Sequence, residues 1–223
     1  MSGNSAQLLA EDLRDLRLLN RYLCGSRSVV LALCRVLGRE PLKHLSILDV
    51  GTGSADIPAV IFAWAKRRHL AAKIVGIEAD PITARIAVNR TLQHADINIV
   101  QGDAGAPPFS PGSFDYVIAS QFLHHFTEAK IIDLLKGWAT LARRGIIISD
   151  LVRHPLAYLG IRLLTRLTMR NIMTRTDAPL SVRRAFTVNE WRDLLRQADL
   201  GPVEMISVFP FRMAAVVQLG GRR

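Results

Sequence analysis

Cysteine is scarce in this chain of 223 residues, which contains only Cys24 and Cys34. The two thiols lie in a segment with no neighbouring pair of histidines, whereas protein zinc sites gather several Cys and His ligands. We therefore expect two reduced, partly buried cysteines and no metal site, because cytosolic redox conditions keep thiols free.

Long apolar runs are also absent. We find no uninterrupted stretch of about 18 apolar residues, so no membrane-spanning helix is predicted. The polar, acid-containing stretch 1–17 does not fit a secretory signal. Residence in the cytoplasm is the default expectation.

The chain is nevertheless rich in apolar residues, at 49% of the sequence, and these alternate with turn residues as in a globular protein. Its length suits one α/β domain covering residues 1–223. The net charge is +10, and positions 143–196 hold 11 arginines against four acids. Such a surplus could attract RNA, an anionic membrane or an acidic protein, or could form a solvated basic face.

The stretch 45–58, LSILDVGTGSADIP, organises the rest of the chain. An apolar run typical of a buried parallel strand ends at Asp49. Gly51 and Gly53 then allow a sharp turn and a close approach to a ligand. Ligands of open α/β sheets bind at this carboxyl edge of the strands.

The spacing of this turn distinguishes two kinds of ligand. A dinucleotide fingerprint needs a small third residue, where this chain has Asp56. The register acidic-x-Gly-x-Gly-x-small instead resembles motif I of the class I S-adenosylmethionine-dependent methyltransferases. Ala55 replaces the last glycine of that motif, a change that should narrow the loop without closing it.

The resemblance implies S-adenosylmethionine as cofactor and no metal. An expected strand at 73–77 ends at Glu78, where the family places its ribose-binding acid, a role that nucleotide-binding α/β folds give to such a carboxylate. Asp103, after an expected strand at 97–100, matches the acid that accepts from the adenine amino group. The cofactor contacts expected in this way are Asp49, Gly51, Thr52, Gly53, Glu78, Ala79, Asp103, Ala104 and Ser120.

The expected fourth strand, 114–120, resembles motif IV of the family, and the SQFLHHF segment that follows should face the transferable methyl group. His124 and His125 are the best acid/base candidates, because a neutral imidazole accepts a proton near neutral pH. Similar LHH segments occur in the ubiquinone and menaquinone biosynthesis methyltransferases, where they often shape the cofactor wall. On a helix, adjacent residues point about 100° apart, so only one of the two is expected to face the cleft.

Residues 1–40 are expected to form two helices, broken around 24–26. This segment could close over the cofactor as a lid, with Asn20, Arg21 and Tyr22 toward substrate. A helix pair that merely packs on the sheet is the alternative.

A second capping segment is expected at 151–186, after a fifth strand at 145–149. Asp150 and His154 are pocket-facing candidates, although Asp150 could simply pair with a nearby arginine. Residues 156–184 alternate apolar and arginine residues, as does an amphipathic basic helix. It could grip an anionic or lipid-like substrate, rest on a membrane, or cap the fold with a solvated arginine face.

These elements, with a hairpin of strands at 203–208 and 213–219, predict a doubly wound sheet. The resemblance supplies its seven-stranded order, 3-2-1-4-5-7-6, with strand 7 antiparallel. We expect methyl transfer to a small aromatic or polyketide-like, lipophilic acceptor, mainly at oxygen, by a monomer or a homodimer. An RNA methyltransferase and a non-catalytic cofactor-binding protein are the alternatives. Nucleic acid is disfavoured, since SQFL stands where an Asn/Asp-Pro-Pro-Tyr motif would be.

Overall fold

The computed structural model describes residues 2–38 and 42–220. The predicted lid segment 1–40 therefore includes positions 1, 39 and 40 that lie outside the described residues. Seven strands form one sheet in the order β3-β2-β1-β4-β5-β7-β6, as predicted. The strands are β1 His44–Val50, β2 Ala71–Glu78, β3 Ile97–Gln101, β4 Phe114–Ser120, β5 Ala142–Leu151, β6 Val203–Val208 and β7 Arg212–Gln218.

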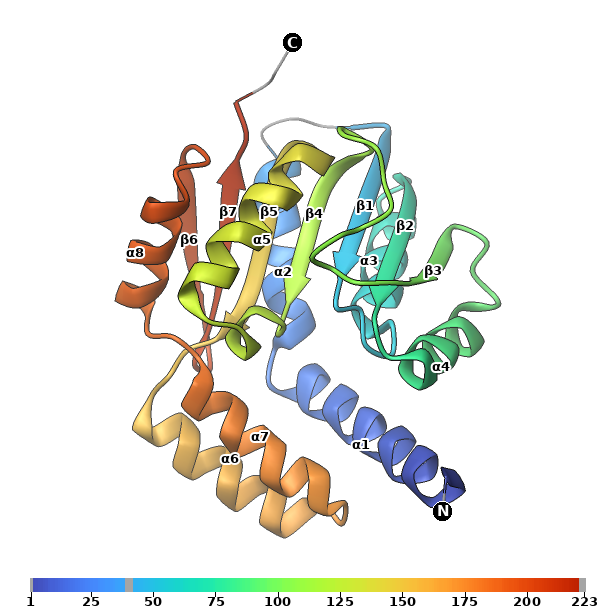
Figure 1. The fold of residues 1–223 in the computed structure, drawn as a ribbon, viewed down its shortest axis with the longest axis vertical. Coiled ribbons are helices and arrows are strands. Elements are labelled where there is room, and N and C mark those ends of the chain that lie inside the picture. Colours follow the sequence, from blue (N-terminus) through green and yellow to red (C-terminus); the bar gives the residue numbers. More distant parts are fainter. Residues whose placement is uncertain (1, 39–41, 221–223) are drawn as a thin grey trace.

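Strand β7 runs antiparallel to both of its neighbours, and the other neighbouring pairs are parallel. This confirms the predicted direction of strand 7. The amino end of β7 therefore lies at the same edge of the sheet as the carboxyl ends of β1, β4 and β5 (Figure 1).

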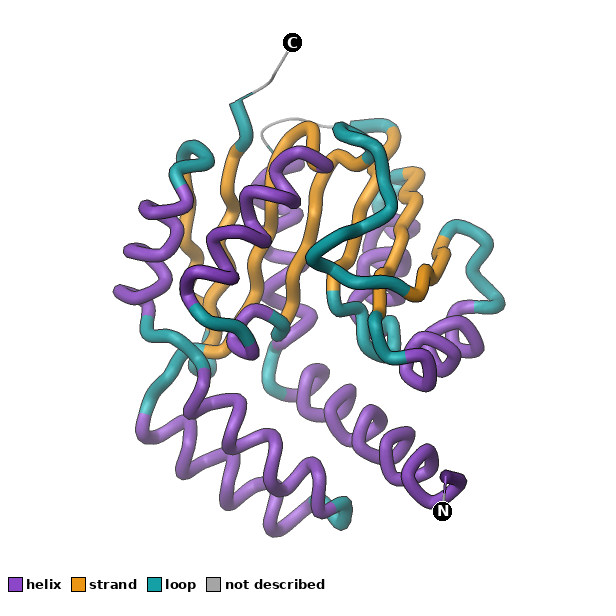
Figure 2. Tube along the Cα trace, in the orientation of Figure 1, coloured by secondary structure: helices purple, strands orange, loops and turns teal. Residues whose placement is uncertain are grey.

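Eight α-helices are described: α1 Ser2–Tyr22, α2 Gly25–Leu37, α3 Asp56–Arg67, α4 Pro81–Thr91, α5 Glu128–Leu141, α6 Pro155–Thr168, α7 Ile172–Arg184 and α8 Val188–Ala198. Helices α2 and α3 bury an apolar cluster on one face of the sheet, and α5 and α8 bury another on the opposite face (Figure 1). Figure 2 shows the resulting helix-sheet-helix layers.

Local sequence signals set the starts of several helices. Asp80 accepts a hydrogen bond from the Thr83 amide at 2.7 Å and caps α4, which begins with a proline. A capping box starts α8, because Thr187 and Glu190 bond each other's backbone amides. Ala55 precedes α3 with a φ of 59°, a left-handed conformation that glycine adopts more easily.

A layer of three helices, α1, α6 and α7, lies below the carboxyl ends of the parallel strands (Figure 1). We call this layer the cap. Leu19, Ile161, Ala178 and Val182 form its apolar centre. Within the described residues, no helix is long and apolar enough to cross a bilayer.

Two expected elements need correction. The single basic helix predicted over 156–184 is two helices, because Met169 is extended and Asn171 caps a new helix by accepting from the Met173 amide at 2.8 Å. The fifth strand continues to Leu151, so Asp150 lies inside the strand rather than after it.

Candidate active site

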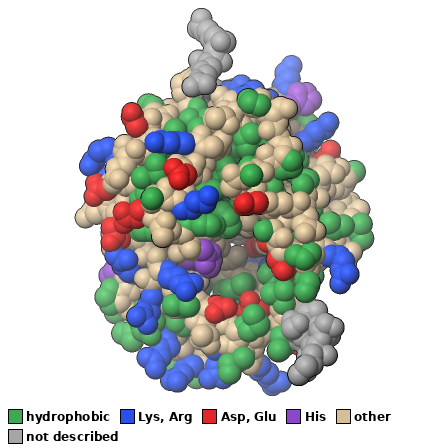
Figure 3. All heavy atoms as spheres, in the orientation of Figure 1, with side chains coloured by type: hydrophobic (Ala, Val, Ile, Leu, Met, Phe, Trp, Pro, Cys, Tyr) green, Lys and Arg blue, Asp and Glu red, His purple; other side chains and the backbone are tan. Residues whose placement is uncertain are grey.

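The main cavity of the described residues, about 690 Å³, lies between the sheet and the cap. Its floor comes from the ends of β1, β4 and β5 and the start of β7, and its roof from α1, α6 and α7. The space-filling view is hollowed between these two parts (Figure 3). This is the sheet edge at which α/β folds bind their ligands.

The glycine turn forms one wall of the cavity. Gly51 and Gly53 have φ values of 65° and 56°, which non-glycine residues rarely adopt. A side chain at Gly51 would also collide with the Phe122 ring, whereas nothing lies within 4 Å of the position that a Gly53 side chain would take. The backbone at Gly53 is therefore open to a ligand.

Asp49 lines the same wall but is only 2% exposed. The Thr52 hydroxyl donates to its Oδ2 at 2.6 Å. Burial raises the pKa of Asp49 to about 7, despite the opposing effect of this hydrogen bond. Asp49 therefore titrates near neutral pH when the turn is free of ligand.

The two strand-end acids expected to hold a nucleoside lie beside this turn rather than inside the cavity. Glu78, at the end of β2, accepts from the Gly53 amide at 2.9 Å through Oε2 and from the Asp80 amide at 3.1 Å through Oε1. Asp103 is exposed and accepts from the Gly105 amide at 2.8 Å. Neither they nor Ala79 and Ala104 line the cavity.

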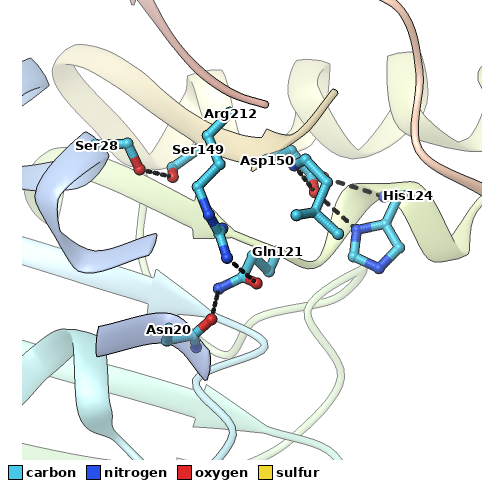
Figure 4. A network of polar contacts seen from close by, with 8 residues as sticks. Asn20, Ser28, Gln121, His124, Ser149, Asp150 and Arg212 are labelled. Carbon is cyan, nitrogen blue, oxygen red and sulfur yellow. Dashed lines mark hydrogen bonds and ion pairs between the residues drawn. The ribbon is translucent and has the colours of Figure 1, made fainter. Parts of the chain in front are cut away.

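A polar chain crosses from the cap to the sheet at the far wall (Figure 4). Arg212, the first residue of β7, donates through Nη2 to Gln121 at 3.1 Å and through Nε to the Leu23 carbonyl at 2.5 Å. The Gln121 amide donates to Asn20, whose own amide donates to Asp56 at 3.1 Å. Burial lowers the pKa of Arg212 to about 10. Of the three predicted lid contacts, only Asn20 lines the cavity.

His124 and Asp150 form a buried pair that lies beside the Arg212–Gln121 contact (Figure 4). His124 Nδ1 lies 2.7 Å from Asp150 Oδ1, and the side chains are 3% and 1% exposed. His124 lines the cavity, and its Nε2 is buried without a hydrogen-bond partner among the described residues. An ionised carboxylate at Nδ1 favours the tautomer whose Nε2 carries a free lone pair. The arrangement can accept a proton from a ligand in the cavity.

Both histidines line the cavity, contrary to the expectation that one would turn away. They lie in a short 3₁₀ helix, Leu123–His125, and their ring centroids are 4.2 Å apart. Partial burial, and then the neighbouring His124, lower the pKa of His125. His125 therefore shares the wall, but no carboxylate in the described part of the chain bonds to its ring.

Four predicted substrate contacts do not reach the cavity. Arg21 and Tyr22 point to solvent, Tyr22 with 75% of its surface exposed, because adjacent residues of α1 face different directions from Asn20. Asp150 faces His124 rather than the cavity. His154 is exposed and caps α6, where it accepts from the Leu156 amide at 3.2 Å.

Arg212 and Gln121 were missed by reasoning from the sequence. The available signal was that Arg212 directly precedes the strand expected at 213–219, whose antiparallel direction puts its amino end at the ligand-binding edge. Arg212 is 4% exposed, and within residues 2–38 and 42–220 its Nη1 has no hydrogen-bond partner.

The turn fits a sulfonium nucleoside. Gly53 leaves open space, and the Glu78 carboxylate faces the turn. Ser120 Oγ in the cavity wall is buried and has no partner among the residues that the structure describes. Asp56, which also lines the cavity, adds a negative charge suited to a cationic ligand. Among the residues that the structure describes, no group of three or more Cys, His, Asp or Glu side chains could hold a metal ion.

Residues 47–145 match the family model described as a methyltransferase domain. A SAM-dependent methyltransferase from Aquifex aeolicus has the same fold, with a TM-score of 0.60, 15% identity and coverage of 83% of this chain and 88% of that one. The PH0226 protein of Pyrococcus horikoshii OT3 has a TM-score of 0.62 and 16% identity, with coverage of 87% of this chain and 91% of that one.

Magnesium protoporphyrin IX methyltransferase from Synechocystis, with SAH bound, gives a TM-score of 0.58 and 15% identity over 87% of this chain and 83% of that one. No curated protein matches the sequence significantly. Residues 47–145 are thus similar to a methyltransferase domain, and the seven-stranded sheet has the fold of S-adenosylmethionine-dependent methyltransferases.

Proposed function

We propose that this protein methylates a hydroxyl oxygen of a small aromatic or polyketide-like, lipophilic acceptor. The observation that carries the proposal is the His124–Asp150 pair, with Nδ1 bound at 2.7 Å and Nε2 unpartnered in the cavity wall. Such a base is useful for a weakly acidic hydroxyl, which must lose its proton to attack well.

The cap supports the choice of a lipophilic acceptor. Its helices present mainly apolar side chains to the cavity, and pockets for small molecules are built in this way, with few polar groups fixing orientation. The apolar residues that the cap contributes are Leu13, Leu16, Leu19, Leu156, Ala157, Ile161, Leu164, Ala178, Leu180 and Val182.

Asp150 holds the His124 ring in one orientation and one tautomer. His124 Nε2 then takes the proton of the acceptor hydroxyl as the oxygen becomes nucleophilic. S-adenosylmethionine supplies a methyl group already activated on a sulfonium centre. The cap and the glycine turn align the two ligands and exclude water, and such alignment provides much of the acceleration of a bimolecular transfer.

The test is a transfer assay with methyl-labelled cofactor and three acceptor sets: phenols, hydroxylated polyketides and bulk RNA. We expect label in ether products of the first two sets, with the rate falling at least a hundredfold in His124→Gln. His44→Gln changes an exposed histidine at the amino end of β1 and should leave the rate unchanged.

Label in RNA alone would identify the RNA alternative. Cofactor binding without transfer to any acceptor would favour a non-catalytic cofactor-binding protein. Products methylated on carbon would be compatible with His124 as the base but would refute oxygen as the methylated atom.

A further inference from the structure

Helix α6 carries a row of exposed leucines that the active site does not use. Leu156, Leu159, Leu163 and Leu167 are 57–76% exposed. Their spacing of three and four residues places them along one side of the helix. Single exposed leucines are ordinary, whereas a continuous apolar strip marks an interaction surface. We call this strip the leucine face.

Arginines border the leucine face. Arg162 and Arg166 are exposed one turn apart on α6, and Arg170 follows the helix. Helix α6 has no acidic residue, and within the described part of the chain these three arginines make no ion pair. Apolar and basic side chains share the lower part of the molecule in Figure 3, where Figure 1 draws α6 and α7.

The other side of α6 lines the cavity. Ala157, Gly160, Ile161 and Leu164 face inward, and Leu156 belongs to both surfaces. Helix α6 thus separates the apolar cavity from the leucine face by the thickness of one helix.

We propose that the leucine face docks the protein on the surface of an anionic phospholipid bilayer, with α6 lying in the plane of the interface. An apolar strip bordered by arginines is the pattern of helices that insert their leucines among acyl chains while their cations meet lipid headgroups. The net charge of +10 adds attraction to the same surface. This inference does not depend on the acceptor or on the atom methylated.

Charge argues against a second copy of the chain as the occupant. Two leucine faces in contact would bring Arg162, Arg166 and Arg170 of both copies together with no acid on either α6. An anionic bilayer offers acyl chains to the leucines and negatively charged headgroups to the arginines.

The test is flotation of the purified full chain with vesicles of phosphatidylcholine, with and without one quarter phosphatidylglycerol, at low salt and at 0.5 M NaCl. We expect binding to the anionic vesicles that weakens in high salt. The double variant Leu159→Asn/Leu163→Asn should bind at least tenfold more weakly. The double variant Arg162→Gln/Arg166→Gln should bind the anionic vesicles about fivefold more weakly for each arginine removed.

Leu92→Asn is the matched control, because Leu92 is 73% exposed but follows α4 and is no part of the leucine face on α6. It should bind vesicles like the wild type. All variants change exposed side chains, so their circular dichroism and melting should match the wild type, and cofactor binding should persist.

Absence of vesicle binding by the wild type would overturn the proposal. So would equal binding by the leucine variant and the control. Dimerisation that requires the leucines, detected by sedimentation, would assign the face to a second copy instead. Saturable binding of an acidic protein without vesicle binding would assign it to a protein partner.

Discussion

Asp150 Oδ1 lies 2.7 Å from His124 Nδ1, and its second oxygen, Oδ2, accepts from the His124 backbone amide at 3.3 Å. One carboxylate in β5 therefore fixes both the ring and the backbone of a residue after β4. Asp150 does not line the cavity, so the role that we propose for it is to position His124.

Asp150→Asn tests this relationship. Asparagine can donate to Nδ1, which would place the proton on Nε2 and remove the lone pair that faces the cavity. We expect kcat to fall by about 10²- to 10⁴-fold, the usual contribution of a general base. The binding of S-adenosylhomocysteine, measured by calorimetry, should be unchanged.

The acceptor's ionisation separates a positioning role from a merely structural one. An acceptor that is already ionised in solution needs no base, so if Asp150 only positions His124, the Asp150→Asn enzyme should methylate that acceptor at close to the wild-type rate. Equal losses for ionised and neutral hydroxyls would contradict the positioning role.

Glu78→Ala tests the cofactor site. If Glu78 accepts hydrogen bonds from ribose hydroxyls, its loss should weaken S-adenosylhomocysteine binding by about 10- to 150-fold, since a hydrogen bond to a charged group contributes about 1.5–3 kcal/mol. Glu128→Gln, an exposed acid in the first turn of α5, is the control. Calorimetric titration measures both, and tight NADH binding would show that the glycine turn has been misread.

The cofactor side of the site follows from sequence better than the acceptor side. Glycine spacing and a strand-end acid are local, so the contact between Glu78 and the turn that carries Gly53 could be anticipated. The inward face of α1 depends on how that helix rotates against the sheet, which explains why Asn20 reaches the cavity but Arg21 and Tyr22 do not.

The fold likewise divides into features that local sequence predicts and features that depend on distant parts of the chain. Parallel strands have nearly continuous apolar runs, and the order and direction of the strands came from the family resemblance. The break between α6 and α7 was missed because the apolar and arginine pattern continues through it, and only the cap of Asn171 marks the new helix. The pairing of Asp150 with His124 joins β5 to the 3₁₀ helix after β4, and neither segment alone predicts it.

Asp49 should make the ligand-free protein less stable as pH rises. Its folded pKa of about 7 lies above the ordinary aspartate pKa of 3.8, so the folded state retains a proton that the unfolded state releases. The contribution is complete below about pH 4 and is lost as pH rises to about 7, with a total of up to about 4 kcal/mol.

Asp49→Asn isolates this effect, because its side-chain oxygen can still accept from Thr52 and cannot ionise. In urea unfolding at pH 5 and pH 7.5, the wild type should lose more free energy of unfolding between the two pH values than the variant. Equal losses would mean that Asp49 is ionised throughout this range in the folded state.

Arg212→Lys tests how the cap is held to the sheet. Lysine lacks the planar fork of arginine, so it cannot bond the Leu23 carbonyl and Gln121 in the same geometry. Losing one such bond to a charged group, worth about 1.5 kcal/mol or more, should speed opening of the junction between α1 and α2 about tenfold. Hydrogen exchange of the α1 amides measures this opening.

Arg27→Lys provides the control, since Arg27 is exposed near the start of α2. The core amides of β1 and β4 should exchange alike in wild type and both variants, because Arg212 bonds only the edge of the sheet. Faster exchange confined to α1 in Arg212→Lys would establish that the first residue of β7 anchors the cap. Uniform acceleration through the sheet would instead mean that Arg212 supports the whole fold.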